Sequence, residues 1–318
     1  MKINSNISFT IPTYNRAEFL DSCLENKINI VQKYSIAIYI SDNASTDNTR
    51  DIVEKWQKIY PYLYYHRNDT NLDMDGNFEI ALNLPNTEYI WLFGDTYQIK
   101  EESLAYILTL LNKKDHDYDA IVFNLENLIS SPTKNYMDQN ELLCDLSGLM
   151  SCIACLVYNK KVIKNALFSR YKNTFFSLEA IIFEYIADKK FIVHWTQTES
   201  VKGLSLKGKL KKNWSNSNRM LMIGVEGWLK FIYALPASYS LESKFSIHKL
   251  FGKVSGLLSY RGLLVRRGDN ALTLSSLKKY YHSFILTAGV FKFLFAVMIC
   301  LIPSSFIKVI LDTLKNKI

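Results

Sequence analysis

The feature that most constrains the fold is an alternation of short apolar stretches with amphipathic stretches over residues 7–93. Four stretches have the length and residue types of β-strands: Ile7–Pro12, Ser35–Ile40, Tyr62–His66 and Ile90–Phe93. Between them, apolar residues recur at helical spacing, as in Ala17–Ile30. Strands that alternate with helices in this way predict βαβ units and a mainly parallel sheet, so the expected fold class is α/β.

Polar residues stand where three of these strands end. Asn15 follows the first strand, Asp42 and Asn43 follow the second, and Gly94-Asp95 follows the fourth. The carboxyl ends of parallel strands share one edge, and ligands of open α/β sheets bind outside that edge. A carboxylate there is placed to meet a ribose hydroxyl or a metal-bound diphosphate. For Gly94-Asp95 taken alone, a plain β-turn is the alternative interpretation.

Composition sets wider bounds on the chain. Its 318 residues are enough for one large α/β domain and an appendage. A formal net charge of +8 favours anionic partners, namely phosphate groups, anionic lipid or nucleic acid. No nucleic-acid motif is recognisable, so nucleic acid is not expected as a partner. Met1–Asn6 leads directly into the first predicted strand without the pattern of a signal peptide, so we expect the active part in the cytoplasm.

Several motifs, taken as an ordered set, resemble those of family 2 glycosyltransferases of the GT-A fold. They are Ile11–Arg16, Ser41–Asp47, Asn71, Asn77 and Gly94-Asp95. Within that family the chain looks most similar to bacterial O-antigen sugar transferases of the abequosyltransferase-like group. The resemblance is strong over Ile7–Ser103 and fades towards residue 200. It implies that a nucleoside diphosphate sugar is the donor substrate.

The resemblance also implies which residues bind the donor. In the family, the loop that matches Thr13–Arg16 lies against the nucleotide, and the acid that matches Asp42 hydrogen-bonds the base. The acid that matches Asp95 meets the ribose and the metal-bound diphosphate. The donor-binding residues expected on this basis are Pro12, Thr13, Tyr14, Asn15, Arg16, Asp42, Asn43, Asn77 and Asp95. Asp95 is also the expected ligand of a divalent metal cofactor, Mg²⁺ or Mn²⁺.

The metal-binding motif of this chain is incomplete. The family usually has Asp-x-Asp, whereas this sequence reads Asp95-Thr96-Tyr97. The closing acid is normally the direct metal ligand, and a phenol with a pKa near 10 binds Mg²⁺ or Mn²⁺ poorly at neutral pH. Metal binding in this chain is therefore expected to be weak, to use other oxygens, or to be absent.

The resemblance also points to a catalytic base. Inverting enzymes of this fold place a carboxylate base near the start of a helix in the region of Thr174–Ala180, and Glu179 is the matching candidate. A solvated acid in the first turn of a helix, stabilised by the helix dipole, is the alternative interpretation. Asp138, Glu141 and Glu184 are rival candidates.

Two further features are candidates for contacts to the donor phosphates. His194 ends a late strand, Phe191–Trp195, where a histidine at the edge of the core is the alternative. The segment Lys202–Trp214 is rich in lysine, glycine and serine, and a basic loop of this kind can close over a diphosphate. A solvated run of charge is the alternative. Its clustered lysines are Lys207, Lys209, Lys211 and Lys212.

The C-terminal part is apolar and basic. Phe284–Ile302 is almost continuously apolar, with Lys292 inside it and Pro303 after it, and is just long enough to span a bilayer. The lysine inside and the basic residues around it favour an interfacial or re-entrant helical hairpin. A helix pair packed on the protein's own core is the alternative. The expected domains are a glycosyltransferase domain at 1–215, a helical extension at 216–282 and membrane-associating helices at 283–318.

Together these features predict an inverting hexosyl- or deoxyhexosyltransferase at the cytoplasmic face of the inner membrane. It would move a sugar from a nucleoside diphosphate to a polyprenyl-diphosphate-linked saccharide, in the synthesis of O-antigen or capsule. The alternative is a catalytically degenerate member of the family that binds a sugar nucleotide or scaffolds a polysaccharide assembly complex. The departure at Tyr97 is the main support for that alternative.

Overall fold

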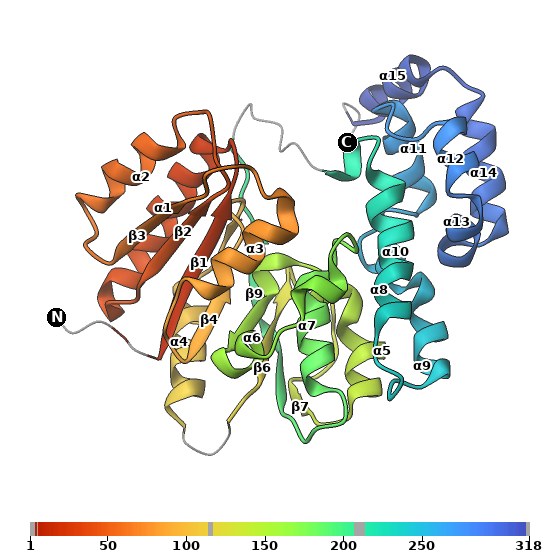
Figure 1. Ribbon diagram of the computed structural model, residues 1–318. Helices are drawn as coiled ribbons and strands as arrows, with labels where there is room; N and C mark the ends of the chain where they lie inside the picture. Colours follow the sequence, from red (N-terminus) through yellow and green to blue (C-terminus); the bar gives the residue numbers. More distant parts are fainter. Residues whose placement is uncertain (1–3, 5, 114–116, 207–213, 316–318) are drawn as a thin grey trace. The chain divides into compact units, whose positions relative to one another are not determined.

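The computed structural model describes residues 4, 6–113, 117–206 and 214–315 of the chain (Figure 1). Contacts divide the chain into two compact units that interleave in sequence. The first unit consists of Met1–Gln139, Cys152–Ser169 and Ile181–Lys209. The second consists of Asn140–Ser151, Arg170–Ala180 and Leu210–Ile318. The boundaries that we expect near residues 215 and 283 stay predictions, because this division follows packing and not the order of the sequence.

The first unit is built on a mixed sheet. Its strands lie in the order β3-β2-β1-β4-β8-β6-β9-β5, and β7 pairs with β9. The strands are β1 Ile7–Thr13, β2 Ile38–Asp42, β3 Leu63–Arg67, β4 Tyr89–Leu92, β5 Tyr97–Gln98, β6 Ala120–Leu125, β7 Lys134–Tyr136, β8 Leu156–Asn159 and β9 Val193–Gly203. β1 to β4 are parallel to one another, as the alternation of strands and helices predicts. Beyond β4 the sheet is mixed, because β8 runs antiparallel to both β4 and β6.

The observed strands shift the predicted boundaries towards the carboxyl end. β2 ends at Asp42 and β3 at Arg67, so both residues belong to strands and not to the loops that follow. β9 extends to Gly203, well beyond the predicted end at Trp195. In each case the strand continues through polar residues because its neighbour supplies ladder hydrogen bonds, which residue composition does not reveal.

Helices cover the sheet of the first unit. They are α1 Ala17–Val31, α2 Thr49–Gln57, α3 Asp73–Asn83, α4 Glu101–Asn112 and α6 Lys160–Lys164. α1 packs against α2, and α3 packs on β1 and β2 (Figure 1). The core contains a row of stacked rings, in which Trp91 lies 5.1 Å from Phe9 and 4.4 Å from Phe123 between ring centroids. β1 is buried along its whole length, as expected for a central strand covered on both faces.

The second unit is helical. Its helices are α5 Gln139–Met150, the first turn of α7 Ser177–Ile186, α8 Trp228–Ala234, α9 Leu241–Ser246, α10 Leu250–Val254, α11 Tyr260–Gly268, α12 Leu274–Lys279, α13 Tyr281–Ala288, α14 Val290–Cys300 and α15 Ser304–Lys315. Shorter helical turns in the chain are η1 Gln32–Tyr34, η2 Ile153–Cys155, η3 Phe168–Tyr171, η4 Trp214–Asn216, the π-helical η5 Met222–Gly227 and η6 Ile247–Lys249. The aromatic core of the unit centres on Trp228, whose ring stacks on Phe251 at 5.5 Å.

The long apolar run near the C-terminus is broken into separate helices. Gly289 has φ +90°, a conformation that favours glycine, and it ends α13 and precedes α14. No single helix among the described residues is long and apolar enough to cross a membrane. α14 and the part Ser304–Leu314 of α15 meet the length and composition criteria only together, and they are bent by 104°.

Candidate functional site

The candidate site lies at the carboxyl ends of the parallel strands. The register pairs Thr13 of β1 with Asp42 of β2, and Asp42 with Arg67 of β3. Residues from three neighbouring strands therefore stand in one row at the edge of the sheet. Asp95 follows β4, the neighbour of β1 on its other side. The structure thus places Asp42 and Asp95 at the same edge of the sheet, as the sequence predicts.

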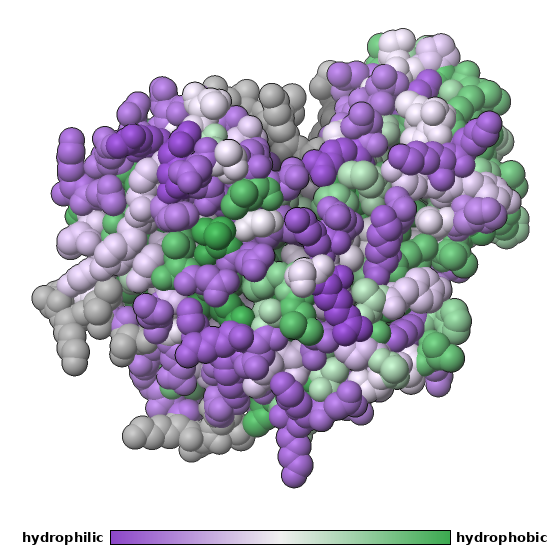
Figure 2. Space-filling model, viewed as in Figure 1, coloured by the Kyte–Doolittle hydropathy of each residue, from purple (hydrophilic) through white to green (hydrophobic). Residues whose placement is uncertain are grey.

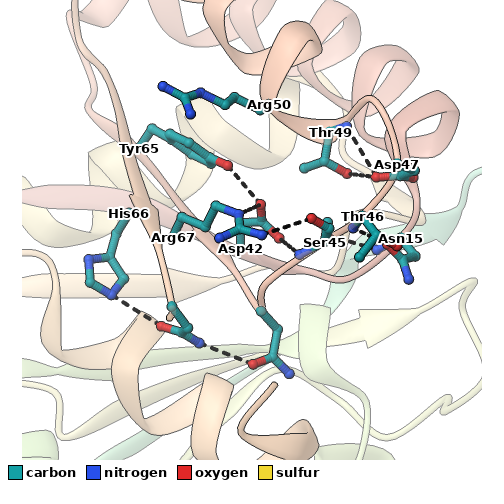
Figure 3. Close-up of polar contacts among 12 residues, drawn as sticks. Asn15, Asp42, Ser45, Thr46, Asp47, Thr49, Arg50, Tyr65, His66 and Arg67 are labelled. Atoms are coloured by element: carbon teal, nitrogen blue, oxygen red, sulfur yellow. Dashed lines mark hydrogen bonds and ion pairs between the residues drawn. The ribbon is translucent and has the colours of Figure 1, made fainter. Parts of the chain in front are cut away.

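Asp42 is buried and fully engaged (Figure 3). Its Oδ1 accepts a hydrogen bond from the Ser45 backbone N–H at 2.9 Å, and its Oδ2 accepts one from the Tyr65 hydroxyl at 2.7 Å. The Arg67 guanidinium lies 3.7 Å from the same Oδ2. Burial and the bond to the carboxylate raise the pKa of Tyr65 above its ordinary value. The carboxylate is thus held in one orientation by a hydroxyl, an amide and a cation.

The loops after β1 and β2 are tied to each other. The Asn15 N–H donates to Ser45 Oγ at 2.9 Å, and Asn15 Oδ1 accepts from the Thr46 N–H at 2.7 Å. Asp47 Oδ2 accepts from the N–H of Ala17 at the start of α1, at 3.0 Å (Figure 3 shows Asp47). Asn15 adopts φ +50°, a left-handed conformation that asparagine tolerates better than most residues. This bracing fixes the polar loop at the rim before any ligand is bound.

Asparagine side chains form a second layer beneath the rim. Asn77 Oδ1 accepts from Ser41 Oγ at 2.7 Å, and Asn77 Nδ2 donates to the Ser41 carbonyl at 3.1 Å. Asn68 Nδ2 donates to Asn43 Oδ1 and to Asn77 Oδ1, each at 3.1 Å. Asn43 Nδ2 in turn donates to Asn71 Oδ1 at 2.9 Å. Asn43 and Asn77 are buried, so in this state they shape the loops of the rim.

Asp95 joins the end of β4 to the loop after β1. Its Oδ2 accepts from Thr13 Oγ1 at 2.9 Å, and its Oδ1 pairs with Arg16 Nη1 at 3.1 Å. Asp95 is buried, whereas the Arg16 side chain is 37% exposed. Tyr14, in the same loop, is 44% exposed. Arg16 and Tyr14 can therefore meet a ligand from solvent, whereas the buried Thr13 supports Asp95.

The Tyr97 side chain is half-buried and lies beside Cys152. Its ring packs under Gly94, where an added Cβ would lie 2.9 Å from Tyr97 Cδ2, and its hydroxyl shares a hydrogen bond with the Cys152 thiol. The charge of a Cys152 thiolate, together with burial, raises the pKa of Tyr97 well above its ordinary value. The Tyr97 carbonyl accepts from the buried Lys27 ammonium at 3.2 Å. The third position of the motif is thus structural, and it offers no anionic oxygen beside Asp95.

The described residues contain no group of three or more His, Cys, Asp or Glu side chains that could hold a metal ion. Asp95 is the carboxylate at the end of β4, and Arg16 already balances its charge. These residues do not fit a metal held mainly by the protein, and we derive no catalytic step through a metal. Divalent metals are common in enzymes of this fold, and Asp95 stays the predicted ligand.

The structure places the candidate bases in different surroundings. Glu179 lies in the first turn of α7 within the second unit, and it is 1% exposed, so it is not a solvated acid in this state. Glu141 is exposed in the same unit. Asp138 is exposed and Glu184 is half-buried in the first unit. The assignment of Glu179 as catalytic base stays a prediction.

His194 and the lysine cluster are the two other candidates for contacts to the donor phosphates. Both ring nitrogens of His194 have protein partners: Nε2 lies 2.6 Å from the Tyr106 hydroxyl and Nδ1 lies 2.7 Å from Asn135 Oδ1. The geometry agrees with the alternative interpretation, a buried histidine at the edge of the core. The lysine cluster Lys207, Lys209, Lys211 and Lys212 lies outside the described residues.

Sequence reasoning missed the residues that hold Asp42 from the next strand. Tyr65 and Arg67 are two residues apart on β3, so their side chains lie on the same face and reach the same carboxylate. The sequence signal for this contact is the spacing of Tyr65 and Arg67, which places both on the face of the strand next to the acidic end of β2. The predicted third strand ends at His66, whereas β3 extends to Arg67.

The fold and the acids at its strand ends define a GT-A protein, which confirms the predicted fold class. Residues 8–168 match the glycosyl transferase family 2 domain. The chain therefore belongs to glycosyl transferase family 2.

Three comparisons describe what the chain is similar to. It is 43% identical over 115 residues to the abequosyltransferase RfbV of Salmonella typhimurium strain LT2, covering 35% of this chain and 34% of that protein. It is 22% identical over 198 residues to a Campylobacter jejuni GalNAc(5)-diNAcBac-PP-undecaprenol β-1,3-glucosyltransferase, covering 59% of this chain and 62% of that protein. The fold is similar to Staphylococcus aureus TarS residues 1–349 in complex with UDP-GlcNAc, with a TM-score of 0.56, 14% identity and coverage of 95% and 90%.

Proposed function

We propose that the chain transfers a hexosyl or deoxyhexosyl group from a nucleoside diphosphate to a lipid-linked saccharide, in the synthesis of a bacterial surface polysaccharide. Family membership supports glycosyl transfer. The name of the Campylobacter jejuni relative, which contains PP-undecaprenol, supports a saccharide acceptor carried on a polyprenyl diphosphate. The aligned segment spans about a third of the first relative, so its donor sugar is not carried over to this chain.

The observation that carries the proposal is the pair of buried acids at the ends of β2 and β4, the two strands that flank β1. Each is held by a hydroxyl and an arginine: Asp42 by Tyr65 and Arg67, and Asp95 by Thr13 and Arg16. An acid fixed in this way accepts hydrogen bonds from a base or ribose without losing conformational entropy at the moment of binding. We assign Asp42 to the base side of the donor and Asp95 to the ribose and diphosphate side.

The leaving diphosphate needs positive charge, and Arg16 is the residue we assign to that role. It is part-exposed, and its partner Asp95 lies at the rim. A guanidinium can give two parallel hydrogen bonds to a phosphate and does not lose its charge at neutral pH. Stabilisation of the departing charge lowers the barrier to displacement.

The chemical step proposed is direct displacement with inversion. A carboxylate accepts the proton of the acceptor hydroxyl, the hydroxyl oxygen bonds to the anomeric carbon, and the bond to the nucleoside diphosphate breaks. Glu179 is the proposed base. Changing Glu179→Gln keeps the shape and removes the basic oxygen, so we expect transfer to fall by at least about 100-fold while donor binding is kept. Loss of donor binding as well would assign Glu179 a structural role.

Membrane attachment at the cytoplasmic face is the proposed location. The name of the Campylobacter jejuni relative contains PP-undecaprenol, a lipid carrier, and the helices α14 and α15 expose apolar residues to solvent. We propose a peripheral or monotopic attachment through these helices. A truncation after Ser283 would remove Ile299 and Cys300, which are buried, so point variants on the exposed side test the attachment more cleanly than a deletion.

A second candidate function rests on one observation. Because Tyr97 faces Cys152 and not the site, the protein supplies one carboxylate where relatives usually supply two. A degenerate protein that binds a sugar nucleotide or scaffolds an assembly complex would have the same feature.

Transfer itself separates the two candidates. Purified protein is incubated with radiolabelled nucleoside diphosphate sugars and lipid-linked saccharides extracted from bacterial membranes, and the lipid fraction is counted. We expect label in the lipid fraction with at least one donor, and release of that label by mild acid, which cleaves the polyprenyl diphosphate linkage. A donor that binds but never labels the extracted lipids favours the degenerate protein.

A further inference from the structure

The helices α14 and α15 of the second unit and the turn between them carry an apolar surface that faces solvent. We call it the apolar face and define it by six side chains that are each more than half exposed: Phe291, Leu294, Met298, Leu301, Phe306 and Val309. Those on α14 are three or four residues apart, which places them on one side of the helix. Figure 2 shows hydrophobic residues gathered over these helices. Apolar patches of this kind mark interaction sites in soluble proteins.

The other side of the same helices is packed, so the apolar face is held open by the fold. Ala296 and Ile299 of α14 and Ile307 of α15 are buried. Arg267 fixes the bend between the two helices, because its guanidinium donates to the Ile302 carbonyl at 2.8 Å and to the Leu272 carbonyl at 3.3 Å. α14 and α15 are therefore packed on the rest of the unit along one side.

Positive charge is concentrated in the same part of the chain. Residues 260–318 contain nine Lys and Arg residues and two Asp residues, so this segment holds +7 of the formal net charge of +8. The two acids are Asp269 and Asp312. A segment that combines an apolar surface with this excess of cations complements an anionic bilayer better than it complements a second copy of the same basic segment.

A groove of about 550 Å³ lies beside the apolar face, between α12, α13 and α14. Leu274, Phe293 and Val297 form its apolar wall. Lys278, Lys279 and His282 line it as well, and all three are exposed. α12 begins with a capping box between Thr273 and Ser276, which fixes the helix that carries both lysines. The groove thus pairs a cationic rim with an apolar wall, the chemistry of a lipid headgroup and the start of its chain.

We propose that the apolar face docks on an anionic bilayer and that the groove binds the phosphate headgroup of one membrane lipid. The apolar face enters the boundary between headgroups and acyl chains, and Lys278 and Lys279 contact the phosphate. This inference rests on the proposed membrane location and adds the residues, the lipid charge and the headgroup site. It does not depend on the identity of the donor or of the acceptor.

The test compares two pairs of exposed lysines in the same unit. The groove variant carries Lys278→Gln and Lys279→Gln, and the matched control carries Lys249→Gln and Lys253→Gln, which remove the same charge away from the groove. Binding is measured by co-sedimentation with vesicles of phosphatidylcholine alone or mixed with phosphatidylglycerol, and folding by thermal melts. A lysine near an anionic surface contributes roughly fivefold, so the groove variant should bind mixed vesicles about 30-fold more weakly. The control should lose less than about threefold, because charge that does not contact the surface is screened by salt.

Two further measurements complete the test. One distinguishes a lipid headgroup from free phosphate, and the other measures how much the apolar face contributes to vesicle binding. Inorganic phosphate at the concentration of the lipid should not displace the parent protein, because it offers no apolar chain. The variant Leu294→Ser with Met298→Ser should weaken binding to both kinds of vesicle. Equal losses in the groove and control variants, or displacement by inorganic phosphate alone, would overturn the headgroup site.

The headgroup site and the proposed function can be tested separately, because vesicle binding and donor binding are different measurements. Stabilisation by nucleoside diphosphate sugars is measured on the same preparations. A groove variant that binds vesicles as the parent does overturns this inference and leaves glycosyl transfer untouched. A parent that binds vesicles through the groove but binds no donor counts against the proposed function alone.

Discussion

Asp42 and Asp95 are each held by a hydroxyl group and an arginine, but the two acids differ in where their support comes from. Asp42 is fixed by its own loop through the Ser45 N–H and by the next strand through Tyr65 and Arg67. Asp95 is held from the end of β1 by Thr13 and from the loop after β1 by Arg16. Asp42 is therefore held from two directions, by its own loop and by the next strand, whereas Asp95 is held from the end of β1 and by Arg16. We expect from this difference that the Asp42 half of the site is the better preformed and that the Asp95 half adjusts when a diphosphate arrives.

The largest effect should come from removing the better-supported acid. In Asp42→Ala the Ser45 N–H, the Tyr65 hydroxyl and the Arg67 guanidinium lose their common acceptor. An unpaired buried group costs about 1–3 kcal/mol, so we expect donor affinity to fall by about 100-fold and the melting temperature to fall measurably. Calorimetry with the stabilising donor checks the first and a thermal melt the second. The shape-conserving Asp42→Asn serves as control, and unchanged donor affinity in both variants would refute the assignment.

The second-largest effect is expected from Asp95, the acid in the half of the site that we expect to adjust. Asp95→Asn removes the charge that holds Arg16 but keeps a hydrogen-bond acceptor for Thr13. We expect turnover to fall about 10–100-fold with a smaller change in melting temperature than Asp42→Ala gives, because Arg16 is already part-exposed. Steady-state kinetics and a melt measure both. A melting temperature that falls more than in Asp42→Ala would reverse the comparison between the two sides.

A third effect comes from Tyr97, which the sequence alone suggests as a site for restoring the metal motif. Because the side chain faces Cys152, Tyr97→Asp should place a carboxylate in half-buried surroundings and lower stability by about 1–3 kcal/mol. Metal titration of turnover should show no gain in metal affinity. The control Tyr97→Phe removes only the hydroxyl and should stay within about threefold of the parent. Tighter metal binding in Tyr97→Asp would mean that the segment turns outward when the donor is bound.

The smallest effect is expected from Arg67→Gln. Its guanidinium is 3.7 Å from Asp42 and its side chain is 42% exposed, so the ion pair is screened by solvent. Such pairs contribute about 0–1 kcal/mol, and we expect donor affinity to change less than about fivefold, with less difference at high salt. Titration at two salt concentrations measures this. A loss as large as that of Asp42→Ala would show that Arg67 contacts the donor directly.

The sequence predicts that Asp42 and Asp95 lie at one edge of the sheet, because the end of a strand can be recognised from a few consecutive residues. Asp42 and Asp95 each follow an apolar strand, and parallel strands place such residues at one edge. Tyr65 and Arg67 escape prediction because their relation to Asp42 depends on the register of β2 with β3. The placement of the Tyr97 side chain depends on Cys152, which is distant in sequence.

Two other features lie beyond local sequence patterns. Residues 140–151 and 170–180 pack with the helical second unit although they lie between segments of the first. The apolar run Phe284–Ile302 reads as one segment, but Gly289 breaks it into two helices, and one side of α14 is buried against the unit while the other is exposed. Only the packing partners decide which apolar residues face solvent.

The central claim is that Asp42 and Asp95 together bind a nucleoside diphosphate sugar. Melting temperatures of the parent and of the double variant Asp42→Asn with Asp95→Asn are measured across a panel of uridine, guanosine, cytidine and thymidine diphosphate sugars. A ligand bound only by the folded state stabilises by about 2.7 kcal/mol at 100 times its Kd. We predict that at least one donor raises the melting temperature of the parent by several degrees and that the same donor leaves the double variant unchanged. Equal stabilisation of both proteins, or of neither by any donor, would contradict the account.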